Sequence, residues 1–197
     1  MRTHSYRYAA LFFALFILTT GCSEDTEYKQ SFQITIPITF DDFTDPAGTV
    51  ATVNETISPS IGVNVDMRTD NPQLVAAADG GDLDELVINE ISYTVTSNSA
   101  SIDIPALDIA VGPADIKDFN SEDAVLIGSI PPIPAGGTTS GTLTLYPENN
   151  SFARAFIFSL YFGLVTHTEL SVIAGENIPE GAVNIELNFQ LTMLSEG

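Results

Sequence analysis

The amino-acid sequence predicts an all-β fold, an antiparallel β-sandwich with one short helix. Apolar and polar residues alternate in several short segments, which is the pattern of strands with one buried face. Turn-forming residues separate these segments, and only one segment has the ends of a helix. The sequence leaves open whether the sandwich has an immunoglobulin-like strand order. The disulfide and tryptophan of antibody domains are absent, because the chain has one cysteine and no tryptophan.

The first and the last predicted strands have the clearest alternation. In segment 31–40, every second residue is apolar: Phe32, Ile34, Ile36, Ile38 and Phe40. Pro37 interrupts the polar positions and has no backbone N–H, so it predicts an edge strand or a bulge. Segment 183–193 has the same period, with Val183, Ile185, Leu187, Phe189, Leu191 and Met193. We expect each strand to bury one face in the core.

Shorter segments complete the predicted sandwich. Strands are expected at 50–57, 87–95, 102–104, 107–111, 125–130 and 142–146. A short helix is expected from Asn71-Pro72 to Ala78, because an N-cap residue and a proline begin it and Gly80-Gly81 follow it. Segment 131–137 contains three prolines and two glycines, which predicts a break between strands.

Segment 151–162 fits both periods. A strand would align Phe152, Phe156, Phe158, Leu160 and Phe162, whereas a helix would align Phe152, Ala155, Phe156, Ser159 and Leu160. We interpret the segment as a strand.

The N-terminus has the composition of an export signal. Arg2 and Arg7 precede ten consecutive residues without a polar side chain, from Ala9 to Leu18. As a helix, this run would rise about 15 Å against a hydrocarbon core of about 30 Å, so it is too short for a permanent span. We therefore predict a cleaved signal peptide rather than a transmembrane helix.

The apolar run ends in Leu18-Thr19-Thr20-Gly21-Cys22. This segment resembles the lipobox of bacterial lipoprotein precursors, although Thr19 stands where that family usually has leucine. The resemblance implies lipid attachment at Cys22, removal of residues 1–21 and a membrane anchor made of lipid. Ser23 is typical of lipoproteins sorted to the outer membrane, where the domain would face the periplasm or the cell surface. Lipidation also explains why an exported chain has a single cysteine.

Removal of the signal leaves 176 of the 197 residues, which fits one domain. Residues 22–30 are predicted to form the lipidated N-terminus and a polar tether, and residues 31–197 the single sandwich domain. The mature chain has four Lys and Arg against 26 Asp and Glu, a formal charge of −22. Such a charge excludes nucleic acid as a partner and disfavours contact with anionic lipid. It suits solubility in salty surroundings.

The residue types argue against an enzyme. His167 is the one histidine of the mature chain, threonines flank it, and no nucleophile-elbow pattern occurs in the sequence. Without a second histidine or a free cysteine, a zinc, iron or copper site is not expected. Carboxylate pairs of the kind that glycosidases use arise by chance in so acidic a chain. We therefore predict no catalytic residue.

Calcium is the one cofactor that the residue types permit, because it accepts several oxygen ligands from irregular loops. The candidate ligands are Asp79, Asp82 and Asp84, with Asp41, Asp42 and Asp45 as a second group. Neither group has the spacing of an EF-hand loop. We expect solvated acidic turns and no resident cofactor.

The sequence therefore predicts a membrane-tethered envelope lipoprotein whose noncatalytic sandwich binds a protein partner, a glycan or another extracellular ligand. The strand that contains Pro37 is a candidate edge for recruiting a partner strand. A second hypothesis is a calcium-dependent carbohydrate-binding or adhesive module. A hydrolase that uses His167 is a third.

Overall fold

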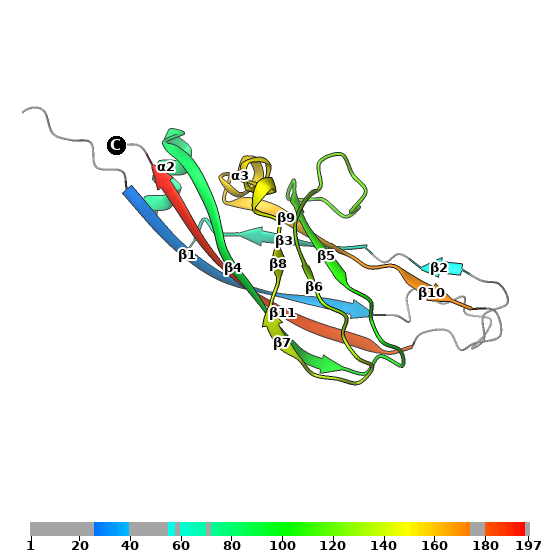
Figure 1. The fold of residues 1–197 in the computed structure, drawn as a ribbon. Helices are drawn as coiled ribbons and strands as arrows, with labels where there is room; N and C mark the ends of the chain where they lie inside the picture. The colour runs from blue at the N-terminus through cyan, green and yellow to red at the C-terminus, as the bar shows by residue number, and fades with distance from the viewer. Residues whose placement is uncertain (1–25, 40–54, 58–59, 70–71, 174–179, 196–197) are drawn as a thin grey trace, which may run out of the picture.

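Two antiparallel sheets pack face to face in the computed structural model, which describes residues 26–39, 55–57, 60–69, 72–173 and 180–195 (Figure 1). The four-stranded sheet has the order β1-β11-β4-β7, formed by Thr26–Thr39, Ala182–Ser195, Leu83–Asn98 and Ser140–Thr142. The five-stranded sheet has the order β3-β9-β5-β6-β8, formed by Ser60–Asp66, Tyr161–His167, Leu107–Gly112, Val125–Ile130 and Thr144–Leu145. A separate ladder pairs β2 (Glu55–Ile57) with β10 (Leu170–Val172). The predicted all-β sandwich is confirmed.

The strand order is that of a jelly roll. The first strand pairs with the last, and each sheet takes strands from both halves of the chain. Two interleaved Greek keys produce such an order. In the immunoglobulin fold, by contrast, the first strand pairs with the second. The immunoglobulin-like order that the sequence left open is therefore not found.

Strand β1 lies at the edge of its sheet, as Pro37 predicts. All 14 residues of β1 pair with β11, from Thr26 opposite Ser195 to Thr39 opposite Ala182, without a shift of register. The strand begins at Thr26, before the predicted start at Ser31. Residues 26–30 therefore belong to the sheet, although we expected them to be part of the tether.

The core lies between the two sheets and forms one main cluster. The even-numbered apolar residues of β1 and the odd-numbered residues of β11 face it, as their alternation predicts. Phe32 stacks on Phe189, with ring centroids 4.6 Å apart, and meets Phe162 of the opposite sheet edge-on at 6.1 Å. Such aromatic pairs stabilise a core beyond the apolar area that they bury. This group of three rings joins β1, β11 and β9 across the sandwich.

The predicted short helix is confirmed as α2, Pro72–Gly80. Leu74 and Ala77 on one face of the helix are buried in the core. Gly81 follows with a positive φ of 74°, and its N–H donates to the carbonyl oxygen of Ala78 at 3.1 Å. A glycine in this left-handed conformation is a common end of a helix.

Our interpretation of segment 151–162 as a strand is wrong except for residues 161 and 162, which begin β9. A 3-10 turn at Pro147–Asn149 leads into a second helix, α3, Asn150–Ile157. Ala153 and Ile157, four residues apart, are its buried residues, while Phe152 is 65% exposed. Leu160, with a positive φ of 55°, then redirects the chain into β9.

Several other elements differ from the prediction: the strand expected at 102–104 is only a bridge between Ile104 and Ile133, and β10 was not predicted. The expected strand at 142–146 is divided, because β7 pairs with β4 in one sheet and β8 pairs with β6 in the other. The buried Leu143 lies between β7 and β8, where the chain crosses from sheet to sheet. Strand β3 was not predicted, and of the strand expected at 50–57 only residues 55–57 fall within the described residues.

The segment 113–124, which we call the β5–β6 loop, covers part of the outer face of the five-stranded sheet. Ala110 of β5, Val165 of β9 and Ile116 of the loop form a small second apolar cluster there. A Cβ atom at Gly62 or Gly163 would collide with the carbonyl oxygen of Ile116 or Pro113, respectively. The absence of side chains at these glycines therefore allows the loop backbone to lie directly on the strands.

Gly163→Ala should lower the free energy of unfolding by about 1–3 kcal/mol, because its methyl group would push the loop off the sheet. Chemical denaturation measures this change. Gly80→Ala is the matched control, since its Cβ would come within 2.7 Å of Oδ2 of Asp82, the end of an exposed side chain that can move aside, and would meet no loop backbone. Equal stability losses in the two variants would contradict the proposed close packing of the loop.

Candidate functional site

His167 lies at the centre of a row of polar residues on the outer face of the five-stranded sheet. It pairs with Ser60 of β3 on one side and with Asp108 of β5 on the other. The Ser60 Oγ atom is 3.3 Å from His167 Nδ1. The next row toward the loop consists of Gly62, Val165 and Ala110, residues that leave room for the loop. The register of three strands thus places a serine, a histidine and an aspartate side by side.

The β5–β6 loop places an aromatic ring on this row. Phe119 stacks on the imidazole of His167, with ring centroids 4.9 Å apart and an angle of 14° between the planes. The stack borders a hollow of about 580 Å³. Its polar lining comes from Asp108, Asn120, His167, Thr168 and Glu169. The lining of the hollow therefore includes two stacked rings and two carboxylates.

The row does not reproduce a catalytic triad. In such a triad one imidazole nitrogen bonds to the serine and the other to the aspartate. Here Ser60 bonds to Nδ1, and the described residues show no hydrogen bond between His167 and Asp108. The hydroxyl of Thr168 donates a hydrogen bond to the carbonyl oxygen of Ala106, at 3.1 Å. The row of Ser60, His167 and Asp108 therefore lacks one of the two hydrogen bonds of a triad.

The calcium candidates do not form a metal site in the described part of the chain. Asp79 lies in the last turn of α2, Asp82 in the following turn and Asp84 on β4. No group of three or more His, Cys, Asp or Glu side chains among the described residues is placed to hold a metal ion. The structure therefore does not bring Asp79, Asp82 and Asp84 together as ligands. Cys22, Asp41, Asp42 and Asp45 lie outside the described residues.

The residues around His167 were not predicted as a site. Phe119, Asn120 and Asp108 are far from His167 in sequence, and only the strand register and the folded loop bring them together. The one signal available in the sequence is His167 itself, the single histidine of the predicted mature chain.

A perturbed pKa can mark a functional group, but here it has a structural cause. Asp66, at the end of β3, accepts hydrogen bonds from the guanidinium of Arg68 at 2.8 and 2.5 Å. Those bonds lower the pKa of Asp66 from 3.8 to about 2. The Arg68 guanidinium also lies over the ring of Tyr161, 4.5 Å from its centroid. The Asp66–Arg68 pair and its contact with Tyr161 therefore connect the end of β3 to β9, and we do not interpret them as a separate site.

No helix within the described residues is long and apolar enough to cross a membrane.

Comparisons with known proteins do not assign the chain to a family. No family model and no curated protein matches the sequence. Among solved structures, one from mud crab tombus-like virus has a TM-score of 0.36 and 14% identity over 88% of this chain and 81% of that chain. One from Desmodium yellow mottle tymovirus has a TM-score of 0.27 and 10% identity over 88% and 90%. A carbohydrate-binding module of the β-sandwich superfamily has a TM-score of 0.30 and 11% identity over 87% and 57%. Scores this low carry no argument about function.

The Asp66 carboxyl should titrate with a midpoint near 2, because its charged form accepts the Arg68 hydrogen bonds. A lowered pKa stabilises the folded state above pH 3.8, and that contribution is lost as the pH falls toward 2. Carbon NMR of the Asp66 side chain measures the midpoint. Arg68→Gln should return it toward 3.8. A midpoint that is the same in the wild type and in Arg68→Gln would contradict this assignment.

Proposed function

We propose that the protein is a lipid-anchored lipoprotein of a bacterial envelope whose sandwich binds an extended segment of a partner protein along the free edge of β1. The observation that carries the proposal is the length and regularity of β1. It pairs with β11 through all 14 of its residues, and no strand among the described residues pairs with its other side. An exposed regular edge is a template for strand addition.

The alternation of hydrogen bonds shows which residues of β1 face the free edge. Ser99 N–H donates to the carbonyl oxygen of Ala182 at 2.8 Å, so Ala182 bonds toward β4. In an antiparallel sheet, successive residues bond to opposite sides. The residues of β11 that bond toward β1 are therefore the odd-numbered ones, and their partners in β1 are even-numbered. The odd-numbered residues of β1 direct their N–H and C=O groups outward. Pro37, which has no N–H to donate, occupies one of these outward positions.

The other strands at the ends of the two sheets are shorter. β7 and β8 have 3 and 2 residues, and β3 has 7, against 14 in β1. Short strands, charges and proline are common means of blunting an edge. On β1 such residues occur only near its ends, as Glu27, Lys29 and Pro37. The uncharged segment 30–36 between them favours pairing with a strand of another protein.

The proposed anchor places this edge close to the membrane. Cys22 precedes Thr26, the first residue of β1, by four positions, which an extended chain spans in about 14 Å at most. The β1 edge would thus begin close to the bilayer. Two or three acyl chains on Cys22 would hold the domain there firmly, because one chain alone binds only marginally.

Lipidation is tested by expressing the wild type and Cys22→Ala in a Gram-negative host. The wild type should lose residues 1–21, gain the mass of acyl chains and sediment with membranes. Cys22→Ala should gain no acyl mass, since no other cysteine exists in the chain. Intact-mass spectrometry and membrane fractionation measure both outcomes. A wild-type protein that is unacylated and retains a free thiol would overturn the anchor.

The edge is tested by a photo-crosslinking residue at Gln33, at the centre of the uncharged segment. In the envelope of the native host, it should give a specific adduct with an extended segment of one protein. Ser31→Pro combined with Thr35→Pro should lower the yield of this adduct by about tenfold or more. Proline has no N–H, so the double variant lacks the two outward donors on either side of Gln33.

Ser31→Ala combined with Thr35→Ala is the matched control, because alanine keeps both N–H groups. Both double variants should retain most of the thermal stability, since the substituted N–H groups do not bond to β11. Full adduct formation in the proline variant would show that the partner does not pair with β1.

A further inference from the structure

We propose that the hollow beside His167 binds a guanidinium group, the side chain of an arginine on a partner protein. The hollow holds two carboxylates, Asp108 and Glu169, next to the stacked rings of Phe119 and His167. A guanidinium is planar, pairs with carboxylates through two parallel hydrogen bonds and stacks on aromatic faces. The hollow offers both kinds of contact. The inference concerns a surface distinct from the β1 edge and does not depend on the lipid anchor.

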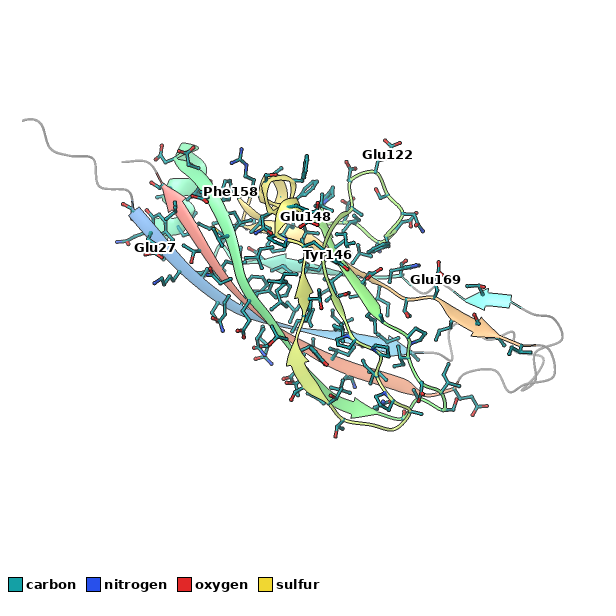
Figure 2. All side chains as sticks on the ribbon, viewed as in Figure 1. Glu27, Glu122, Tyr146, Glu148, Phe158 and Glu169 are labelled. Atoms are coloured by element: carbon teal, nitrogen blue, oxygen red, sulfur yellow. The ribbon has the colours of Figure 1, made fainter. Side chains whose placement is uncertain are left out.

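Neither carboxylate is neutralised within the described residues. The ion pairs there join Lys29 to Glu27 and Arg68 to Asp66, and neither involves the hollow. Asp108 is half-buried beside His167, whereas Glu169 is exposed where β9 passes toward β10 (Figure 2). A charge that is partly shielded from water interacts more strongly with an incoming cation than a fully exposed one does. Asp108 should therefore supply the larger share of the attraction.

The charge of the whole chain selects the same class of ligand. The predicted mature form carries 26 acidic residues against four basic ones. A field of one sign raises the local concentration of ligands of the other sign and speeds their association. An anionic ligand would be repelled, and a neutral glycan could hydrogen-bond to the two carboxylates but would not neutralise their charge. A basic side chain gains from both the field and the local contacts.

The shape of the hollow favours arginine over lysine and over a metal ion. The Phe119 and His167 rings are within 14° of parallel, and both residues line the hollow, so a planar cation suits this lining. The ammonium of lysine is a compact, strongly hydrated charge without a planar face to stack. The described residues around the hollow do not form a group that would hold a metal ion. The amide of Asn120, on the same rim, is a further acceptor for a guanidinium N–H.

The hollow is held in shape before any ligand arrives. Its floor is made of β5 and β9, and the packing of the β5–β6 loop on Gly62 and Gly163 fixes the position of Phe119. The hydrogen bond between Ser60 and His167 further restricts the imidazole. A preorganised site loses less conformational entropy on binding than a mobile one. A partner side chain that enters the hollow therefore meets groups whose positions are already restricted.

The test uses the full chain, purified in neutral detergent, with acetyl-arginine-amide as the probe. Saturation-transfer NMR on the side-chain protons of the probe reports contact, and a titration gives the dissociation constant. Binding should be saturable, whereas acetyl-citrulline-amide, which has a similar planar shape without the charge, should not bind measurably. Acetyl-lysine-amide should bind at least about threefold more weakly than the arginine probe.

Asp108→Asn should weaken binding of the arginine probe by about fivefold, and Glu169→Gln by less. Glu122→Gln is the matched control, because Glu122 lies on the β5–β6 loop outside the lining of the hollow (Figure 2). It removes the same charge and should leave the dissociation constant unchanged. Equal weakening by Glu122→Gln would show general attraction to an acidic protein. That result, or the absence of saturable binding to the wild type, would overturn the proposal.

Discussion

The pairing of β1 with β11 is the interaction on which the rest of the structure depends. It joins the two ends of the described chain, and it places β11 between β1 and β4 at the centre of the four-stranded sheet. The same pairing brings Phe32 onto Phe189 and both strands against Phe162 of the opposite sheet. β11 occupies the inner side of β1, and no strand among the described residues pairs with its outer side. The closure of the sandwich therefore leaves the long edge that we propose as a binding surface.

A second constraint acts on the outer face of the opposite sheet, where glycines stand at positions at which the β5–β6 loop covers the strands. Gly62, Gly112 and Gly163 let the β5–β6 loop approach the strands, and Ile116 fills the space above them. Glycine in a strand costs conformational entropy and gives up side-chain packing. Here the loop restores the packing and carries Phe119 to His167. The hollow beside His167 thus results from the way the β5–β6 loop covers the sheet.

Alternation of apolar residues predicted the strands whose two faces differ sharply in burial, including β1, β4 and β11. It failed for α3, because neither proposed set of aligned residues is the buried one. Ala153 and Ile157 face the core, and the large Phe152 faces solvent. Hydrophobicity alone did not indicate which face of the segment meets the sheet. The site around His167 was also beyond sequence reasoning. Ser60 and Asp108 become its neighbours only through the register of β3, β9 and β5.

The two proposed surfaces would contribute to binding in different ways. Pairing along β1 relies on backbone groups, which give affinity but distinguish partners poorly. A carboxylate-lined hollow adds discrimination between partners. A cation compensates the carboxylates for the water that they lose on binding, whereas a neutral residue does not. Salt weakens the long-range attraction between the chain and a basic partner more than it weakens the contacts at either surface. The long-range attraction of so acidic a chain is screened within about 8–10 Å at moderate ionic strength, whereas strand hydrogen bonds and a half-buried pair with Asp108 are screened much less. In saline surroundings, such a protein would therefore select its partner by contact rather than by its overall charge.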